Sequence, residues 1–526
     1  MKILIADSVS ERAVEILQEQ ASWDVVFLPK KAGANVADEI RDADALVVRS
    51  ATKVTSQLLA GAARLRAIGR AGSGVDNVDL AAATQKGVIV MNTPGGNAQS
   101  VAEHTLALLL SLARRIPQAD ASMKQGRWEK KKLEGMELRG KTLGLVGFGQ
   151  IGAAVANLAK AFEMSVVAYD PYVSSLLADE HAVRLATLDE VMKSADFVSL
   201  HASSTPETRH LVNARTLALA QPGVRIVNCA RGELVNEADL LAALESGQVA
   251  GAGLDVFEAE PPKDSKLVNH PGVIATPHIA GSTEEAQEIV GIRIAEQIRD
   301  FLISGVARNA VNVPAVSPEE FKKLEPYIQL GEKLGAFLAQ IAGERIREVR
   351  ISYDGGLAEL NTHLVKNAVL KGILTPALSQ QVNLVNAGAL AQQRGVEVAE
   401  LRSARRATFS NSLGIGLYTE GESATGVGMV GMRGALRILG LNDIDIEAPL
   451  RGVIIFIRNE DVPGVIGRVG TILGDRKINI ATFTLGRNPQ TQQAIGLVNV
   501  DNHVPDGVVQ EIRAIPAVRT VRVVEV

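Results

Sequence analysis

The stretch Lys141–Pro171 constrains the fold of this chain more than any other. An apolar run, Lys141–Val146, has the pattern of a buried strand, and it is followed by the glycine turn GFGQIG and a helix pattern rich in small residues. A second apolar run, Ser165–Tyr169, ends at Asp170. Strand, glycine turn, helix, strand and acid is the order that a dinucleotide-binding βαβ unit requires.

Each part of this pattern has a physical task. Gly147 allows a tight turn, Gly149 lets backbone N–H groups approach a pyrophosphate, and Gly152 lets helix and strand pack closely. A carboxylate at Asp170 binds ribose hydroxyls and repels a 2′-phosphate, so NAD is predicted rather than NADP. A GxGxxG motif alone can be a glycine turn that binds nothing, but here the strand, the helix and the acid are in register.

Length and composition limit the class of protein. A chain of 526 residues is too long to fold around one hydrophobic core, so three or four domains are expected. A hydrophobic content of 46% with 22% charged residues is typical of a soluble globular protein, and a net charge of −4 creates no basic field for nucleic acid or membranes. The single cysteine excludes an internal disulfide and favours the cytoplasm, and the N-terminus does not have the pattern of a signal peptide.

Strand and helix patterns divide the first three hundred residues into two units. Residues 1–98 alternate strand and helix and predict a small parallel α/β unit. A long helix at Gln99–Arg115 leads into the dinucleotide-binding domain, predicted at 99–281. A second helix at Ser282–Ile303, with Ser282 as its cap, could return the chain to the first unit, which would then comprise 1–98 and 282–306. These two helices would form a hinge beside a cleft.

The stretch ARNAVNVPAVSPEE, with two prolines, is the clearest predicted linker, and two further units follow it. Residues 318–447 mix helix and strand patterns and predict an α+β domain. Its glycine-rich section, Gly414–Gly434, lacks the signature of a phosphate loop, so a twisted, hairpin-rich sheet is predicted there. Residues 452–526 have the order βαββαβ, which is the ferredoxin-like plan.

Three polar residues follow apolar strands of the dinucleotide-binding domain. Bound NAD would leave the protein to hold a substrate carboxylate and to move one proton. His278 suits the proton transfer, Glu260 could orient its imidazole, and Arg231 offers a planar fork to a carboxylate. Singly, each has a simpler interpretation as a loop or turn residue, but together they predict the dehydrogenation of a 2-hydroxy acid.

Longer motifs carry a family resemblance. GRAGSGVDNVD, NTPGGN, the glycine turn with YDP, NCARGELV, LDVFEAEPP and TPHIAGST resemble the D-isomer-specific 2-hydroxyacid dehydrogenases, and the tail resembles their long form. The resemblance implies an α/β protein, with a Rossmann-type NAD domain inserted in a flavodoxin-like substrate domain and followed by an α+β intervening domain and a ferredoxin-like ACT domain. It also implies NAD-dependent oxidation of 3-phospho-D-glycerate to 3-phosphooxypyruvate, the first step of L-serine biosynthesis, by a cytoplasmic homotetramer.

The same resemblance assigns roles to single residues. His278 becomes the acid/base, Glu260 its partner and Arg231 the substrate anchor. The cofactor contacts implied are Gly147, Gly149, Gln150, Ile151, Gly152, Asp170, Cys229, Ala230, Asp255 and Ser73. The substrate contacts expected are Arg49, Arg70 and Asn97, with Lys130 coming from a neighbouring subunit. Arg49 and Arg70 are cations that follow strands and suit a phosphate and a carboxylate, although each could be a solvated surface residue.

In the ACT-like tail, Asn459, Asp461 and Asn479 match L-serine ligands of the family. Asn459 replaces the aromatic or histidine side chain expected there, so L-serine is a possible effector, and a domain that only assembles the oligomer is the alternative. No metal is predicted. Two other functions stay open: another D-2-hydroxyacid dehydrogenase, such as a glyoxylate or hydroxypyruvate reductase, and a non-catalytic NAD(H)-sensing protein.

Overall fold

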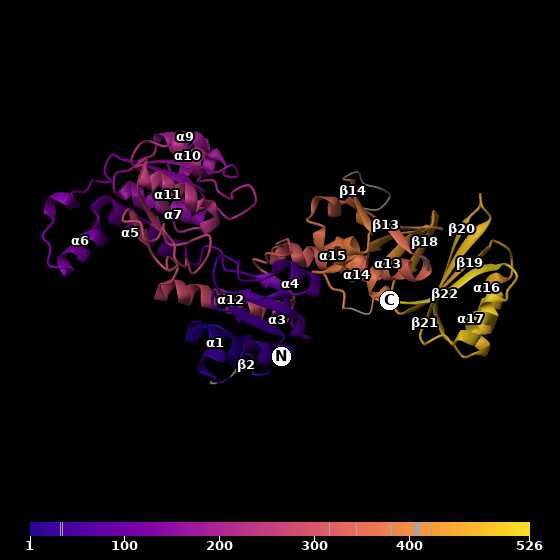
Figure 1. Cartoon of the computed structure of the whole chain (residues 1–526). Helices are drawn as coiled ribbons and strands as arrows, with labels where there is room; N and C mark the ends of the chain where they lie inside the picture. Colours follow the sequence, from indigo (N-terminus) through magenta and orange to yellow (C-terminus); the bar gives the residue numbers. More distant parts are fainter. Residues whose placement is uncertain are drawn as a thin grey trace.

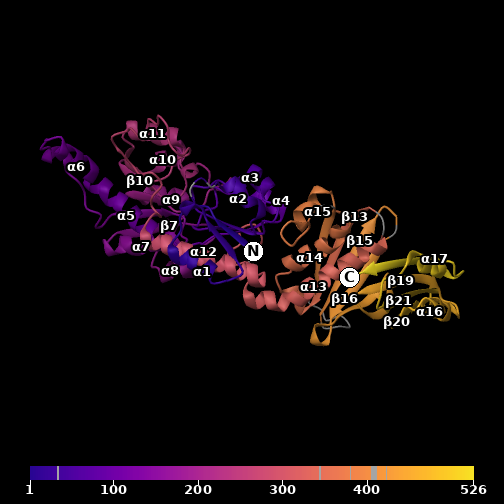
Figure 2. The same cartoon turned by 90° about the horizontal axis from the view of Figure 1, so that it is seen from below.

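The computed structural model describes residues 1–31, 33, 35–314, 316–342, 345–378, 381–403, 411–421 and 423–526. The chain forms a row of units, and two roughly perpendicular views agree on their order (Figures 1 and 2). The dinucleotide-binding unit lies at one end, the N-terminal unit next to it, and the two C-terminal units follow on the other side. Within the described residues, no helix is long and apolar enough to cross a lipid bilayer.

The N-terminal unit is built on a parallel sheet of order β2-β1-β3-β4-β5. This order is that of the flavodoxin fold, as predicted. Ser10 caps the first helix by accepting a hydrogen bond from the amide of Ala13. The strands are β1 (Lys2–Ile5), β2 (Asp24–Phe27), β3 (Ala45–Val48), β4 (Ala67–Arg70) and β5 (Ile89–Met91), and the helices α1 (Glu11–Gln18), α2 (Val36–Glu39), α3 (Ser56–Gly61) and α4 (Leu80–Lys86).

The dinucleotide-binding unit has a parallel sheet of order β12-β11-β10-β9-β6-β7-β8. β6 pairs with β7 on one side and β9 on the other, so the strand order reverses beside the glycine turn, where open α/β sheets bind ligands. The strands are β6 (Thr142–Val146), β7 (Ser165–Tyr169), β8 (Arg184–Leu185), β9 (Phe197–Leu200), β10 (Val224–Asn228), β11 (Val249–Leu254) and β12 (Val273–Ala275), and the helices α7 (Gln150–Ala161), α8 (Ser175–Glu180), α9 (Leu188–Ser194), α10 (Ala214–Leu219) and α11 (Glu237–Glu245).

Two long helices, α5 (Ala98–Arg114) and α12 (Glu284–Ser304), connect these units. The apolar face of α12 packs in the core of the N-terminal unit, where Ile294 and Ile298 lie against β4. The prediction that Ser282 caps this helix is wrong. Ser282 lies in a turn, and the extended backbone of Thr283 places its hydroxyl to accept from the amide of Ala286.

The predicted linker is partly fixed on the N-terminal unit. α12 ends at Gly305, and the amide of Val311 then bonds to the carbonyl oxygen of Val90 on the edge strand β5. The side chain of Asn312 bonds to backbone atoms of Val88 and Val90. Only the remainder of the linker is left to connect the two halves of the chain.

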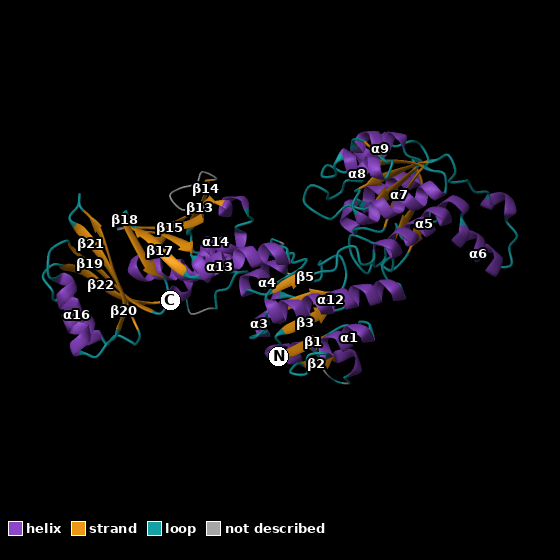
Figure 3. Ribbon diagram, turned by 180° about the vertical axis from the view of Figure 1, so that it is seen from behind, coloured by secondary structure: helices purple, strands orange, loops and turns teal. Residues whose placement is uncertain are grey.

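The third unit has a sheet of order β14-β13-β15-β16-β17-β18, with strands drawn in orange in Figure 3. Its glycine-rich section forms antiparallel hairpins, as predicted. The helices are α13 (Pro318–Ala342), α14 (His363–Leu374) and α15 (Ala387–Gln393), and the strands β13 (Ile346–Gly355), β14 (Glu397–Ser403), β15 (Asn411–Thr419), β16 (Ala424–Val430), β17 (Leu436–Leu441) and β18 (Ile444–Pro449).

The fourth unit has an antiparallel sheet of order β20-β21-β19-β22, with both helices on one face (Figure 1). Its βαββαβ order is that of the ferredoxin-like plan and confirms the prediction. The elements are β19 (Val453–Glu460), α16 (Val465–Asp475), β20 (Ile480–Asn488), β21 (Gln493–Val500), α17 (Asp506–Arg513) and β22 (Val518–Glu525).

Candidate active site

The glycine turn between β6 and α7 has the geometry of a pyrophosphate cradle. Gly147 has φ +97°, and a Cβ built on it would lie 2.6 Å from the carbonyl carbon of His201. A Cβ on Gly152 would lie 2.5 Å from the carbonyl oxygen of Gly147, so helix and strand pack as closely as the sequence predicts. A Cβ on Gly149 would meet no described atom within 4 Å, and this residue opens α7 without a side-chain cap among the described contacts.

The open space at Gly149 is where an anion would meet the free amides of the helix N-terminus, so these residues fit a dinucleotide. Asp170 stands at the end of β7 and accepts hydrogen bonds from the amides of Phe148 and Tyr172 at 2.8 and 2.9 Å. Each of its oxygens keeps lone pairs for a further donor. The side chain of Gln150 contacts the N-terminal unit at Gly95. A Cβ built on Gly95 would lie only 1.5 Å from Oε1 of Gln150. Ile151 packs beside the same turn against the domain core.

His278 and Glu260 form an ion pair at the edge of this domain. Nδ1 of His278 lies 2.8 Å from Oε2 of Glu260, and both side chains are partly exposed. The hydrogen bond that His278 donates to Glu260 raises the pKa of His278, although burial opposes the shift. Burial alone would raise the pKa of Glu260, but the hydrogen bond and charge of His278 hold it below its ordinary value. The pair thus favours a protonated imidazole beside an ionised carboxylate.

Asp255 fixes the loop that carries His278. It is fully buried and accepts hydrogen bonds from the hydroxyl of Thr276 and from the amides of Ile279 and Ala280 at 2.6–2.9 Å. The amide of His278 also bonds to the carbonyl oxygen of Asp255 at 2.9 Å. The sequence analysis predicts that Asp255 contacts the nicotinamide. The structure shows that Asp255 also holds the loop that carries His278.

Arg231 extends from the dinucleotide-binding unit to the N-terminal unit. Its Nε lies 3.0 Å from a carboxylate oxygen of Asp76, and a Cβ built on Gly74 would lie 2.1 Å from its Nη2. Its own backbone is held by the buried side chain of Asn228, which also accepts from the amide of Ala230. Sequence reasoning missed Asp76, although it stands in the motif GRAGSGVDNVD.

Arg70 lies on the other wall of the same cleft, at the end of β4. Its Nε is buried and has no hydrogen-bond partner among the described residues. Burial, followed by the charge of Arg231, lowers the pKa of Arg70 to about 10, so the guanidinium stays charged at neutral pH. A buried cation with an unused donor is a site that an anion would stabilise.

The neighbouring predicted contacts on this wall are ordered by hydrogen bonds. Arg49 follows β3, and its Nη1 donates to the carbonyl oxygen of Ser8 at 3.3 Å. The hydroxyl of Ser73 donates to Oδ1 of Asn97 at 2.8 Å. Gly281 packs against Asn97, so this asparagine lies between the two units at the start of α5.

Cys229 lies in the core at 8% exposure, and burial raises the pKa of its thiol to about 12. The thiol therefore stays protonated, which fits a packing role rather than a nucleophilic one. No group of three or more His, Cys, Asp and Glu side chains in the described part of the chain is arranged to hold a metal ion.

The structure does not bring Lys130 to the other site residues. Helix α6 (Ile116–Lys124) and the following short helix Lys130–Leu133 form an arm that projects from the far end of α5 (Figure 1). Asn97 precedes the first turn of α5, and the 17 residues of that helix span about 25 Å. Lys130 thus lies well outside the cleft of its own chain.

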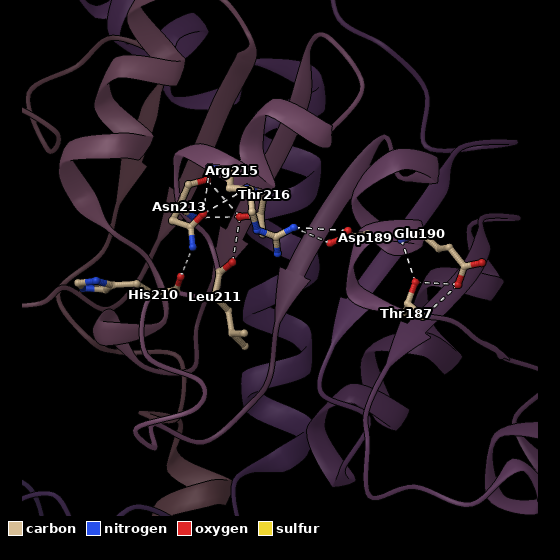
Figure 4. A network of polar contacts seen from close by, with 8 residues as sticks. All are labelled: Thr187, Asp189, Glu190, His210, Leu211, Asn213, Arg215 and Thr216. Atoms are coloured by element: carbon tan, nitrogen blue, oxygen red, sulfur yellow. Dashed lines mark hydrogen bonds and ion pairs between the residues drawn. The ribbon is translucent and has the colours of Figure 1, made fainter.

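A polar network in the dinucleotide-binding unit was also missed from the sequence. Nε2 of His210 lies 2.7 Å from Oε1 of Glu258, two positions before Glu260. The carbonyl oxygen of His210 accepts from the side chain of Asn213, and Arg215 pairs with Asp189 on α9 (Figure 4). The pairs His210–Glu258 and Arg215–Asp189 join residues far apart in the sequence, so no sequence motif predicts them.

The predicted effector residues fall at opposite ends of the fourth sheet. Asn459 is buried in β19 and donates to the carbonyl oxygen of Glu460, and Asp461 is paired with Arg487 at 2.7 Å. Asn479 precedes β20, whose first residue lies level with Val500 and the start of β19. A strand of eight residues spans about 26 Å, so one chain does not bring Asn479 to Asp461.

A dinucleotide cradle, a hydrogen-bonded His–Glu pair and cleft arginines define a class of protein: the NAD-dependent dehydrogenases of hydroxy acids. Three family models match the chain. They are the NAD binding domain of D-isomer specific 2-hydroxyacid dehydrogenases at 106–280, the D-3-phosphoglycerate dehydrogenase intervening domain at 323–442, and the ACT domain at 453–517.

Full-length relatives narrow this class. The D-3-phosphoglycerate dehydrogenase of Bacillus subtilis is 41% identical over 524 residues, covering 100% of this chain and 99% of the relative, and that of Methanocaldococcus jannaschii is 42% identical over 525 residues with the same coverage. The D-lactate dehydrogenase of Aquifex aeolicus, solved with NAD and lactic acid, has 30% identity and a TM-score of 0.51, and covers 60% of this chain and 100% of its own. The chain belongs to the D-3-phosphoglycerate dehydrogenase family, and its cofactor is NAD.

Proposed function

We propose that this protein oxidises 3-phospho-D-glycerate to 3-phosphooxypyruvate with NAD, the first step of L-serine biosynthesis. One observation carries the proposal: Arg231 crosses from the unit that carries the His278–Glu260 pair to Asp76, 3.0 Å away on the unit that carries Arg70, and its charge acts on all three of these groups. An acid/base, a carboxylate anchor and a cation for a second anionic group thus face one cleft.

Bound NAD supplies the hydride acceptor. In the neutral form of His278, Nδ1 donates to Glu260, so Nε2 is the ring nitrogen that faces the substrate hydroxyl and takes its proton. The Glu260 carboxylate then stabilises the imidazolium that results, which is the state that the pair already favours. In the reverse reaction, the protonated imidazole returns the proton to the carbonyl oxygen.

Binding falls to the arginines. Arg231 would hold the substrate carboxylate, which competes with Asp76 for the guanidinium. Arg70, with Arg49 beside it, would bind the phosphate, and Asn97 with Ser73 would add hydrogen bonds at the domain boundary. On the cofactor, the glycine turn with Gln150 and Ile151 would hold the pyrophosphate and Asp170 the ribose. Cys229 and Ala230 would line the cleft, and Asp255 would accept from the carboxamide through an unused lone pair.

The unused Nε donor of the Arg70 guanidinium favours this substrate over glyoxylate or hydroxypyruvate, which have no second anionic group. We expect NADH oxidation with 3-phosphohydroxypyruvate to exceed that with hydroxypyruvate by roughly 10²–10⁴ in kcat/KM, since two charge-assisted contacts are each worth about 1.5–3 kcal/mol. Arg70→Gln should remove most of this preference, while Arg41→Gln, a surface control, should keep it. Equal turnover of both substrates would contradict the assigned substrate.

The catalytic assignment has its own test. His278→Ala should abolish turnover and leave the affinity for NADH within about twofold, because the imidazole lies outside the predicted dinucleotide contacts. Fluorescence titration with NADH and stopped-flow absorbance measure the two properties separately. Turnover at the wild-type rate would refute the role of His278.

We further propose a homo-oligomer, a tetramer by the resemblance, in which the arm of one chain brings Lys130 to the cleft of another. The exposure of Trp128 (79%), Met123 (56%) and Ile116 (54%) on this arm supports the proposal. Trp128→Glu should reduce the oligomer mass in sedimentation and raise the KM for the phosphorylated substrate. An unchanged mass and KM would contradict it.

The remaining parts of the proposal concern regulation and organisation. L-serine would bind between two copies of the fourth unit, with Asn459 and Asp461 from one copy and Asn479 from the other. We keep the predicted boundaries of 1–98 with 282–306, 99–281, 318–447 and 452–526, and a cytoplasmic location. Inhibition by L-serine that Asp461→Ala abolishes would support the effector site, and insensitivity of the wild-type protein would exclude it.

A further inference from the structure

A cavity of about 770 Å³ lies at the junction between the N-terminal unit and the third unit, away from the dinucleotide cleft. Its walls include the turn before β4, the end of α4, the linker after α12 and the loop before α15, together with single residues of α12, α13 and α14. Helices α4 and α15 lie side by side in both views (Figures 1 and 2). Cavities of this size hold small organic molecules.

The chemistry of the walls is divided. One side is apolar, with Phe301, Val306, Val313, Phe321 and Leu384 among its residues. The other side carries the cations Arg64, Arg66 and Lys86, against the carboxylate of Asp44 alone. Asp44 is already paired with Arg64 and with the backbone of Lys2, so two positive charges face the cavity uncompensated.

Arg66 is the clearest sign that the cavity takes an anion. Its guanidinium carbon lies 5.8 Å from the ring centre of Phe301, and no carboxylate or carbonyl oxygen of the described residues pairs with it. Lys86 makes only a 3.4 Å contact with the carbonyl oxygen of Ala60, and partial burial lowers its pKa. Arg66 is exposed and Lys86 half-buried, so an anion between them would form two charge-assisted contacts and offset the partial burial of Lys86.

The cavity also borders the residues that join the catalytic and C-terminal halves. Gly305, Val306, Val313 and Pro314 of the linker line it. Across it, the side chain of Asn383 donates to the carbonyl oxygen of Gly87 at 2.8 Å, and Val385 packs on the core of the N-terminal unit. A molecule in this space would touch both halves at once.

We propose that this cavity binds a small organic anion, a carboxylate or phosphate with an apolar body, and that its occupancy braces the junction between the two halves. Arg66 and Lys86 hold the anionic group, and the apolar wall with Phe301 holds the body. The bound molecule favours the docked arrangement of the third unit because it contacts the linker and the 383–386 loop only there. This gives the chain a third ligand site, after the cleft and the fourth unit.

The test uses the full-length oligomer with saturating NADH and fluorine NMR of 4-(trifluoromethyl)phenylacetate, its phosphonate analogue and the neutral acetamide. At least one of the two anions should bind, and the neutral acetamide should not. The anion that binds more tightly identifies the preferred head group. Arg66→Gln should weaken binding about tenfold, the loss of one charge-assisted contact. Ala63→Trp should block it by filling space, since Ala63 lines the cavity and is exposed.

Two controls separate this site from others. Arg41→Gln removes a surface guanidinium elsewhere on the same unit and should leave probe binding unchanged. Arg231→Gln tests for binding of the probe in the active-site cleft and should also leave the affinity unchanged. The bound anion should also slow amide hydrogen exchange in 306–314. The site would be overturned if neither anion bound at millimolar concentration, or if Arg66→Gln and Ala63→Trp both bound the anions as tightly as the wild-type protein. Anion binding that did not slow the exchange would overturn the proposed effect on the junction.

Discussion

At the residue scale, the chemistry depends on how Glu260 sets the protonation of His278. Since the carboxylate raises the pKa of His278, reduction, which needs the protonated ring, should continue to higher pH than an ordinary histidine would allow. Glu260→Gln should move the alkaline limb of kcat/KM for 3-phosphohydroxypyruvate reduction to lower pH. It should also lower kcat roughly 10²-fold, a typical loss for acid–base catalysis. An unshifted pH profile would show that Glu260 does not act through His278.

A second residue-scale prediction concerns Asp76, which competes with the substrate carboxylate for Arg231. The pair crosses the cleft, and the Asp76 side chain is 70% exposed, so it adds little to the stability of the fold. Asp76→Asn should therefore lower the KM for 3-phosphohydroxypyruvate two- to fivefold without changing the melting temperature. A raised KM would instead make Asp76 a positioning residue that holds Arg231 ready for substrate.

At the element scale, the glycine turn allows binding to be separated from folding. A Cβ on Gly149 enters open space, so Gly149→Ala should leave the melting temperature unchanged and weaken NADH about tenfold or more by obstructing the pyrophosphate. Gly152→Ala places its Cβ against a backbone oxygen and should cost about 1–3 kcal/mol of stability. Calorimetry and NADH titration of both variants make the comparison, and destabilisation by Gly149→Ala would contradict it.

The cap of α12 gives a matched pair of adjacent hydroxyls. Thr283→Ala should lower the free energy of unfolding by about 1 kcal/mol, whereas Ser282→Ala should change it much less. Chemical denaturation measures both. Equal effects would mean that the helix begins one residue earlier than the structure shows.

These elements show what sequence reasoning can reach. The glycine turn, the parallel units and the ferredoxin-like tail were predictable because strand period, helix period and turn residues are local properties. The choice between Ser282 and Thr283 was not, since both side chains can cap and only the backbone conformation decides. Asp76, Glu258 and Arg487 were missed because each meets its partner only after distant segments fold together, and no spacing encodes such a pair.

At the scale of the whole molecule, the predicted cofactor, substrate and catalytic residues all lie within 1–314. The same residues contain both parallel sheets. The solved chain of the Aquifex aeolicus D-lactate dehydrogenase matches 60% of this chain over 100% of its own, so a shorter chain takes up this fold. A chain ending at Pro314 should therefore fold and reduce 3-phosphohydroxypyruvate with a kcat/KM within about fivefold of the full length. The loss expected is regulatory: any response to L-serine should disappear, because the fourth unit is gone. Steady-state kinetics with a circular dichroism control decide the matter, since a folded but inactive chain would mean that the C-terminal units complete the cleft.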